Sequence, residues 1–239
     1  ISSSLPRSKP RREFILPDDY LCTVADAIHS VGGLFVLDCV ASGAIWIDMQ
    51  ACGIDLLISA PQKGLSGPSC AGLVMFSQAA RNRLAETASS SFAVNLQKWV
   101  DIMESYESGT HSYHATMPTD ALAKFCNVLA EIGAYGFDQA KVRQQEMGDR
   151  VRALLAERNI HSVAAAGFEA PGVVVSYADT ADTADKFAAA GLQVSAGVPL
   201  MCDEPEDFQT FRLGLFGLDK IQNVDRTVAT LAAALDQIL

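Results

Sequence analysis

The 239-residue sequence lacks the features that mark several classes of protein. No stretch approaches the ~18 consecutive apolar residues of a membrane-spanning helix. The first twelve residues, ISSSLPRSKPRR, are polar and basic. They contain no apolar core of about 7–15 residues and are therefore not a secretory signal peptide. We interpret them as a disordered or non-native chain end rather than as a remnant of a transit peptide.

Metal-binding and nucleic-acid-binding patterns are also missing. The six cysteines form no C-x-x-C pair, and the four histidines are not spaced with them as zinc ligands, so we expect no metal site. The formal net charge is −10, and the basic residues beyond Arg12 are scattered, which argues against a nucleic-acid partner. We expect most cysteines to be small buried side chains in a reducing, cytoplasmic compartment.

What is present is a composition typical of an α/β protein, organised around the stretch DLLISAPQKGLSGPSCAGL, Asp55–Leu73. An apolar run of strand length ends at Pro61, and Gln62 and Lys63 open a loop rich in proline and glycine. At a partly desolvated strand end the neutral form of a lysine is favoured, and a neutral amine attacks carbonyl groups. Lys63 is therefore a candidate Schiff-base lysine. The alternative is a solvated loop lysine, because lysine is rarely buried.

A second apolar run, Leu34–Val40, contains one carboxylate, Asp38. An unpaired carboxylate in a buried strand is costly unless it meets a cation. A protonated pyridine nitrogen is such a cation. If the two runs are neighbouring parallel strands, Asp38 and Lys63 face one crevice. An aspartate and a lysine in this arrangement are typical of enzymes that use pyridoxal 5′-phosphate (PLP).

The stretch GGLFVLDCVASGAIWIDMQACGIDLLISAPQKGLSGPSCAGLVMFS resembles the class V aminotransferases, which are PLP enzymes of fold type I. The similarity is greatest to the alanine–glyoxylate and serine–pyruvate branch. It lies in D-x-V-x-S, then G-I-D, then S-x-x-QK followed by a Pro/Gly loop. Two later segments fit the same family: SYHATMP (Ser112–Pro118) is similar to its Y-H-x-T-x-P loop, and FRLGLFG (Phe211–Gly217) to its R-[IL]-G-x-x-G strand.

The resemblance implies roles for further residues. Gln62 hydrogen-bonds the cofactor, and Tyr113 and Thr116 reach the cofactor phosphate of the neighbouring subunit, so a homodimer with shared active sites is implied. Without the resemblance, Tyr113 and Thr116 belong to an ordinary turn. Arg212 lies inside an apolar strand, and its planar fork suits a substrate carboxylate. The structural alternative for Arg212 is a salt bridge to a nearby acid: Asp203, Glu204 or Asp207.

By the same resemblance the sequence is the C-terminal portion of a longer enzyme. An upstream section would carry the loop and helix N-terminus that hold the PLP phosphate. We expect residues 1–136 to be the C-terminal part of the PLP-binding large domain, with a mostly parallel sheet covered by helices. Residues 137–239 are expected to form a small C-terminal α/β domain, and Gly136 marks the boundary. A sheet that lacks strands exposes apolar surface.

Apolar periodicity predicts the individual elements. Helices are expected over 17–31, 78–88, 119–135, 138–158, 183–190 and 223–239, with a short helix within 42–53. Strands are expected over 34–40, 55–60, 72–77, 160–164, 173–177, 192–195 and 211–217, the third of them antiparallel by resemblance. Residues 89–114 are expected to be irregular, Thr119 to cap the helix that follows it, and His29 to be a surface or capping side chain.

The sequence thus predicts a PLP-dependent transaminase that moves an amino group between a small amino acid of the alanine or serine type and an oxo acid such as glyoxylate or pyruvate. The first alternative is a cysteine desulfurase-like lyase using Cys202, although that cysteine has no basic neighbour to activate it. A kynureninase-like hydrolase is a weaker alternative. The non-enzymatic alternative is an inactive fragment that serves only as a dimerisation module.

Overall fold

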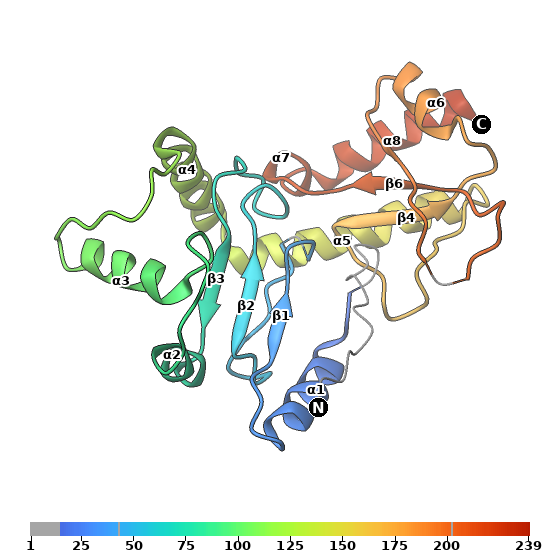
Figure 1. The fold of residues 1–239 in the computed structure, drawn as a ribbon. Coiled ribbons are helices and arrows are strands. Elements are labelled where there is room, and N and C mark those ends of the chain that lie inside the picture. Colours follow the sequence, from blue (N-terminus) through green and yellow to red (C-terminus); the bar gives the residue numbers. More distant parts are fainter. Residues whose placement is uncertain (1–14, 43, 202) are drawn as a thin grey trace.

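A computed structural model describes residues 15–42, 44–201 and 203–239. Two three-stranded sheets and eight helices are found there (Figure 1). The strands are β1 (Val36–Asp38), β2 (Leu56–Ser59), β3 (Leu73–Phe76), β4 (Val173–Tyr177), β5 (Ser195–Ala196) and β6 (Thr210–Gly214). The helices are α1 (Asp18–His29), α2 (Gln78–Ala85), α3 (Leu96–Glu107), α4 (Thr119–Tyr135), α5 (Phe137–Ala156), α6 (Thr183–Ala189), α7 (Leu218–Ile221) and α8 (Val224–Ile238).

The first sheet has the order β1-β2-β3. β1 and β2 are parallel, with Asp38 opposite Ile58, and β3 runs antiparallel to β2. These three strands lie where the apolar runs predict them, and the antiparallel direction of β3 is confirmed. Because β1 and β2 are parallel neighbours, their carboxyl ends meet at one edge of the sheet.

Only one face of this sheet is well covered at β1 and β2. α1 packs there through Leu21 and Ala25, which join Phe35, Leu57 and further apolar side chains in one buried cluster. Alternate strand residues point to the opposite face. On that face Val36 is 50% and Ile58 is 36% exposed. The expected exposure of apolar sheet surface is confirmed for these residues.

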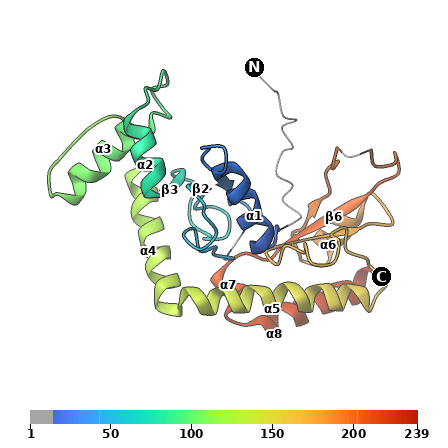
Figure 2. The same ribbon diagram turned by 90° about the horizontal axis from the view of Figure 1, so that it is seen from below.

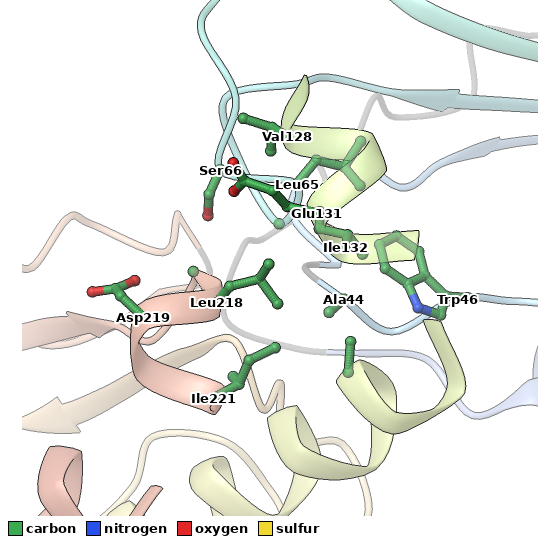
Figure 3. A pocket seen from close by; sticks show the side chains of 13 residues that line it. Ala44, Trp46, Leu65, Ser66, Val128, Glu131, Ile132, Leu218, Asp219 and Ile221 are labelled. Carbon is green, nitrogen blue, oxygen red and sulfur yellow. The ribbon is translucent and has the colours of Figure 1, made fainter. Parts of the chain in front are cut away.

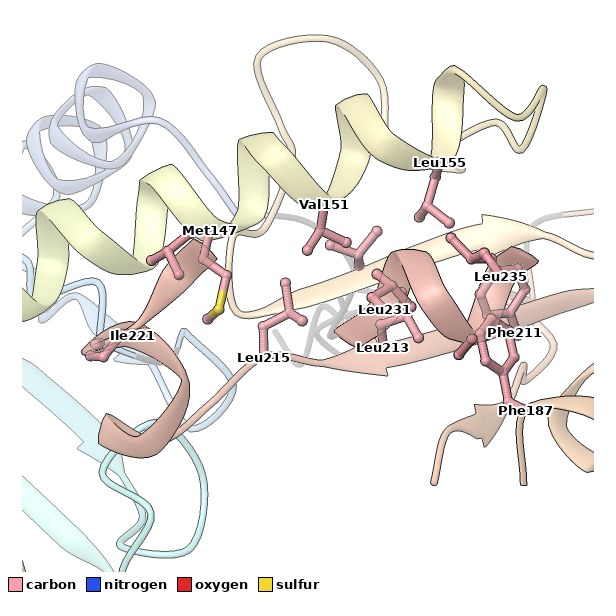
Figure 4. Packing of buried hydrophobic residues seen from close by; sticks show 14 of the residues in the cluster. Met147, Val151, Leu155, Phe187, Phe211, Leu213, Leu215, Ile221, Leu231 and Leu235 are labelled. Carbon is pink, nitrogen blue, oxygen red and sulfur yellow. The ribbon is translucent and has the colours of Figure 1, made fainter. Parts of the chain in front are cut away.

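The second sheet is antiparallel in the order β4-β6-β5 and packs against the long helices α5 and α8. Its core is the largest buried cluster of the described chain, and Figure 4 shows Met147, Val151 and Leu155 of α5 pointing toward side chains of β6 and α8. α5 and α8 are amphipathic, so each buries one apolar stripe against the strands.

Gly136 separates α4 from α5 and has a φ of 101°, a conformation that favours glycine. The chain turns sharply there: α4 and α5 run in clearly different directions in Figure 2. The first sheet precedes this turn, and the second follows it. The α/β fold class is confirmed by these two helix-covered sheets.

Three expectations about local structure were wrong. Residues 89–114 are not irregular throughout, because they contain α3, whose N-terminus is capped by Asn95 accepting from the Lys98 N–H at 3.1 Å. The described residues of 42–53 form turns instead of a helix, since the Asp48 side chain accepts from the backbone N–H groups of Gln50 and Ala51. Residues 160–164 contribute only an isolated bridge between Ser162 and Ser176.

The helix starting near residue 119 also begins differently from the expectation. Thr119 is its first helical residue, not its cap, and the cap position belongs to Pro118, which makes no capping hydrogen bond. No helix within the described ranges is both long and apolar enough to cross a membrane.

Candidate active site

Asp38 and Lys63 lie at the same edge of the first sheet. Asp38 is the last residue of β1, and Lys63 follows the end of β2 at Ser59 by one short turn. The edge is the carboxyl end of both parallel strands, the place where open α/β sheets bind ligands. The predicted juxtaposition of these two strand ends is therefore present in the fold.

Only one oxygen of the Asp38 carboxylate forms a hydrogen bond within the part of the chain that the structure describes. Its Oδ1 accepts a hydrogen bond from the Val40 N–H at 2.9 Å, and Oδ2 has no hydrogen-bond partner within residues 15–42, 44–201 and 203–239. The side chain is exposed and points to the uncovered face of the sheet. One oxygen thus fixes the carboxylate, and the other is available to a cationic N–H.

The Lys63 side chain is half-buried, and its Nζ forms neither a hydrogen bond nor an ion pair with any residue that the structure describes. The backbone around it is tightly turned. The Gly67 N–H donates to the Pro61 carbonyl at 2.8 Å, and the Ser66 N–H donates to the Lys63 carbonyl at 2.8 Å. These two bonds hold the backbone of the loop around Lys63, and neither of them involves its side-chain amine.

Packing against α4 fixes this loop. Leu65 is buried with Phe125 and Ile132. Gly67 lies so close to the Phe125 ring that an added Cβ would be 2.6 Å from a ring carbon. Only a glycine allows this approach, so the Pro/Gly composition of the loop has a packing reason. Ser66 adopts a φ of 53°, which is uncommon for a residue other than glycine.

Behind the loop lies a cavity of about 200 Å³, shown in Figure 3. Leu65 and Ser66 line it from the loop, Glu131 and Ile132 from α4, and Leu218 from α7. Neither Asp38 nor Lys63 lines this cavity. It marks the contact between the lysine loop and the C-terminal part of the chain, and Gly64, the residue directly after Lys63, lines it.

Tyr113 and Thr116 lie close to each other, but they are in a different part of the chain from Lys63. The Tyr113 hydroxyl lies 3.1 Å from the Thr116 hydroxyl, and both side chains are exposed. They belong to the connection between α3 and α4, which projects away from the first sheet in both ribbon views (Figures 1 and 2). Beside them, the His114 ring packs against Phe92 and Trp99. Within one chain the structure does not bring the two hydroxyls to the strand edge.

Arg212 lies on β6 in the second sheet, where its Nε donates to the Ala196 carbonyl at 3.1 Å. It forms no ion pair with any described residue, so the structural alternative, a salt bridge to Asp203, Glu204 or Asp207, is not formed. The remaining guanidinium nitrogens are free to bind an anion. Gln62 is exposed beside Lys63. Cys202 lies outside the described residues.

The chain matches known proteins over most of its length. The family model "Aminotransferase class-V" matches residues 20–226. The chain belongs to the class V aminotransferase family. Among curated members of this family, it is 26% identical over 230 residues to the alanine–glyoxylate aminotransferase of Felis catus, covering 87% of this chain and 51% of that protein.

A second curated relative is the 2-aminoethylphosphonate–pyruvate transaminase 2 of Paraburkholderia xenovorans, 28% identical over 229 residues, covering 90% of this chain and 57% of that one. Among solved structures, the alanine–glyoxylate aminotransferase from Nostoc sp. superposes with a TM-score of 0.70 at 20% identity, covering 89% and 56% of the two chains. Its fold is fold type I, as expected here. The chain spans about half the length of the curated relatives it matches.

Class V aminotransferases are PLP enzymes, and the strand edge fits this cofactor in two respects. Asp38 offers an unpaired carboxylate oxygen of the kind that holds a protonated pyridine nitrogen, and Lys63 offers an unpaired amine of the kind that binds an aldehyde. The described residues at this edge contain no helix N-terminus aimed at the cofactor phosphate. The fit therefore covers the ring and the aldehyde, and the phosphate needs groups from elsewhere.

Asp55 was missed by the sequence reasoning as a residue that ties the first sheet together at the amino ends of β1 and β2, the end opposite Asp38 and Lys63. It is buried and accepts from the Phe35 N–H at 2.8 Å and from the Ser77 hydroxyl at 2.9 Å, and His29 Nε2 lies 2.7 Å from its Oδ2. Burial raises the pKa of Asp55, but the hydrogen bonds from His29, Phe35 and Ser77 outweigh it and lower the pKa overall. His29 is thus a partner of Asp55, not merely a surface residue. The sequence feature that could have pointed to Asp55 is its position as an acidic residue directly before an apolar strand.

Proposed function

We propose that the chain is the C-terminal portion of a PLP-dependent aminotransferase that moves an amino group between a small amino acid and glyoxylate or pyruvate. The observation that carries the proposal is the pair of polar groups at one strand edge, Asp38 Oδ2 and the Lys63 amine, neither of which has a partner among the residues that the structure describes. The names of the relatives, alanine–glyoxylate aminotransferase and 2-aminoethylphosphonate–pyruvate transaminase, support an oxo acid acceptor of this size.

When bound, PLP supplies an aldehyde that captures amino groups and a ring that accepts electrons from the substrate carbon. Asp38 Oδ2 would hold the ring nitrogen and favour its protonated form, because the negative charge stabilises a cation. Lys63 Nζ would hold the cofactor at its aldehyde and would be the base for the α-proton of the substrate. Gln62, at the start of the loop, would donate a hydrogen bond to the cofactor.

Arg212 is proposed to bind the substrate carboxylate. Its guanidinium has no acidic partner among residues 15–42, 44–201 and 203–239, and an unpaired arginine fork suits a carboxylate bidentately. Arg212 lies in the second sheet, beyond Gly136, which we propose as the boundary between a large-domain part (1–136) and a small C-terminal domain (137–239). Substrate would then bind between the two domains, a common location of ligand pockets.

Tyr113 and Thr116 are proposed to contact the cofactor phosphate of the partner subunit in a homodimer. Their exposure on an arm that projects from the sheet supports a role between subunits rather than within one.

We also propose that the protein is cytoplasmic, which the free thiols of Cys22, Cys39, Cys52, Cys70 and Cys126 support.

The test is a transamination assay on the purified chain with PLP, alanine and glyoxylate, in which pyruvate is measured. Pyruvate formation by the wild type, lost in Lys63→Ala and kept in Lys98→Ala, would support the proposal; Lys98 is an exposed lysine of α3 and serves as the matched control. Sulfide release from cysteine without pyruvate formation would contradict it in favour of the lyase. A chain that binds no PLP and forms a stable dimer would contradict it in favour of the dimerisation module.

A further inference from the structure

Two cysteines meet on the covered face of the first sheet, away from the proposed active site. Cys22 lies in the middle of α1, and Cys52 lies in the turn just before β2. Cys52 is buried in the cluster that α1 forms with β1 and β2, and Cys22 packs against the same cluster. The turn that carries Cys52 is at the amino end of β2, whereas Asp38 and Lys63 lie at the carboxyl ends of the strands.

The contacts of the two thiols are reciprocal. Cys22 Sγ lies 4.0 Å from the carbonyl oxygen of Ala51, the residue next to Cys52. Cys52 Sγ lies 3.9 Å from the carbonyl oxygen of Asp18, one helical turn before Cys22. Each sulfur therefore points at the backbone beside the other, which brings the two sulfurs together.

We propose that Cys22 and Cys52 are an oxidisable pair that forms a reversible disulfide between α1 and the turn before β2. The oxidant is hydrogen peroxide. The sulfur of the Cys22 thiolate attacks one peroxide oxygen, the O–O bond breaks, hydroxide leaves and Cys22 becomes a sulfenic acid. The Cys52 sulfur then attacks the Cys22 sulfur, the S–S bond forms, the S–O bond breaks and water leaves. In total two thiols and one peroxide give one disulfide and two waters.

Burial sets the order of these steps. Cys22 is half-exposed, whereas Cys52 is 5% exposed, so peroxide reaches Cys22 first. The neighbouring Cys22 side chain, followed by burial, raises the pKa of Cys52 to about 11, so Cys52 stays a thiol while peroxide reacts with Cys22. Its proton leaves with the sulfenic oxygen as water when the Cys52 sulfur attacks. Cys39 packs on the same cluster, but it directly follows the last residue of β1 at the carboxyl end of the strand, whereas Cys22 contacts the turn at the amino end of β2. The geometry thus selects Cys52 over Cys39.

The bond would close a loop of residues 22–52, which contains all of β1 and Asp38. A cross-link of this kind stabilises chiefly by restricting the unfolded chain. Since the pair is at the opposite end of the strands from Lys63, oxidation strengthens the sheet without blocking the proposed cofactor edge. Reduction by a small thiol restores the free pair.

The experiment oxidises the purified chain with a small excess of hydrogen peroxide, blocks the remaining thiols by alkylation and maps the digest by mass spectrometry without reduction. The expected result is a peptide pair joined through Cys22 and Cys52, lighter by two hydrogen atoms and separated again by dithiothreitol. The melting temperature of the oxidised chain should rise by about 5 °C. Cys22→Ser should abolish both effects, and Cys126→Ser, which changes an exposed cysteine of α4, should keep both.

Wild-type mapping keeps the test decisive even if Cys22→Ser does not fold. A cross-link between Cys39 and either partner, a bond between two chains, or oxidation of Cys22 to the sulfinic acid without a cross-link would each overturn the proposal. None of these readouts depends on PLP or on transamination, so this test stands apart from that of the proposed function.

Discussion

The two sheets of the chain differ in how completely they are covered. The second sheet packs on α5 and α8 around a continuous core in which Val151, Val174 and Leu235 are fully buried. The first sheet has α1 over one face, whereas the other face presents Val36, Asp38 and Ile58 to solvent. The second sheet therefore packs within a core of its own, whereas the first sheet leaves apolar side chains exposed on one face.

This difference teaches where the chain's stability and its chemistry are located. The well-packed sheet carries Arg212, a residue proposed to bind substrate, and the half-covered sheet carries Asp38 and Lys63. The chain spans about half the length of its curated relatives, and one face of the first sheet presents apolar side chains to solvent. The proposed cofactor edge thus belongs to the less completely covered of the two sheets.

The largest expected effect comes from truncating the core of the second sheet. Phe211 is 2% exposed and packs against Phe187 with ring centroids 5.4 Å apart. Phe211→Ala should lower the free energy of unfolding by about 3–5 kcal/mol, measured by urea titration with circular dichroism. Val36→Ala on the uncovered face should change it by less than about 1 kcal/mol. Equal costs for the two changes would contradict the comparison.

The buried carboxylate of the first sheet should make its stability pH-dependent. The lowered pKa of Asp55 means that its contribution is fully present above about pH 4, the range of an unfolded aspartate, and is lost as the pH falls through the lower folded pKa. Asp55→Asn should cost about 1–3 kcal/mol at pH 7 and remove this part of the acid dependence. The matched control is Asp26→Asn, an exposed acid on α1. An acid transition that is the same in Asp55→Asn and wild type would refute this role.

Close packing of the lysine loop gives a smaller and more local prediction. Gly67→Ala places a Cβ 2.6 Å from the Phe125 ring, so the loop or the ring must move, at a cost of about 1–3 kcal/mol. PLP binding should weaken as well, because Lys63 is on the same loop. In the control Gly72→Ala the added Cβ meets nothing within 4 Å. Fluorescence titration with PLP measures both variants, and equal affinities would show that the packing does not position Lys63.

The last prediction has the smallest expected effect on stability and concerns substrate binding. Arg212→Lys should keep the fold and PLP binding but weaken alanine binding roughly ten- to a hundredfold, since lysine cannot form the bidentate pair. The KM for alanine should therefore rise much more than kcat falls. Arg226→Lys, on α8, is the control. A changed melting temperature with an unchanged KM would identify Arg212 as a structural residue.

Much of the fold follows from the sequence, because apolar periodicity and Pro/Gly breaks locate β1, β2, β3 and the long helices. The errors have physical causes. α3 was missed because serines surround it, although Asn95 caps it and Val100 and Ile102 are buried. The Asp55 network was missed because its partners, His29 and Ser77, are distant in sequence and only the folded sheet brings them together.

The candidate site also has features that the sequence predicts and features that only the folded chain reveals. The parallel pairing of β1 and β2 places the ends of these strands at one edge, as the apolar runs predict, whereas the roles of Asp38 and Lys63 there stay predictions. The roles of Tyr113, Thr116 and Gln62 depend on groups beyond one copy of this chain, and they stay predictions. That Arg212 has no acidic partner among the described residues was visible only in three dimensions, because candidate acids lie close to it in sequence.

The central claim is that Lys63 carries the cofactor. The most direct measurement is to incubate the purified chain with PLP, reduce it with borohydride and map the pyridoxyl group by mass spectrometry. The account predicts a single major adduct on Lys63, together with an absorbance band that Asp38→Asn shifts or weakens. An adduct spread over exposed lysines such as Lys98 and Lys124, with Lys63 unmodified, would contradict the account.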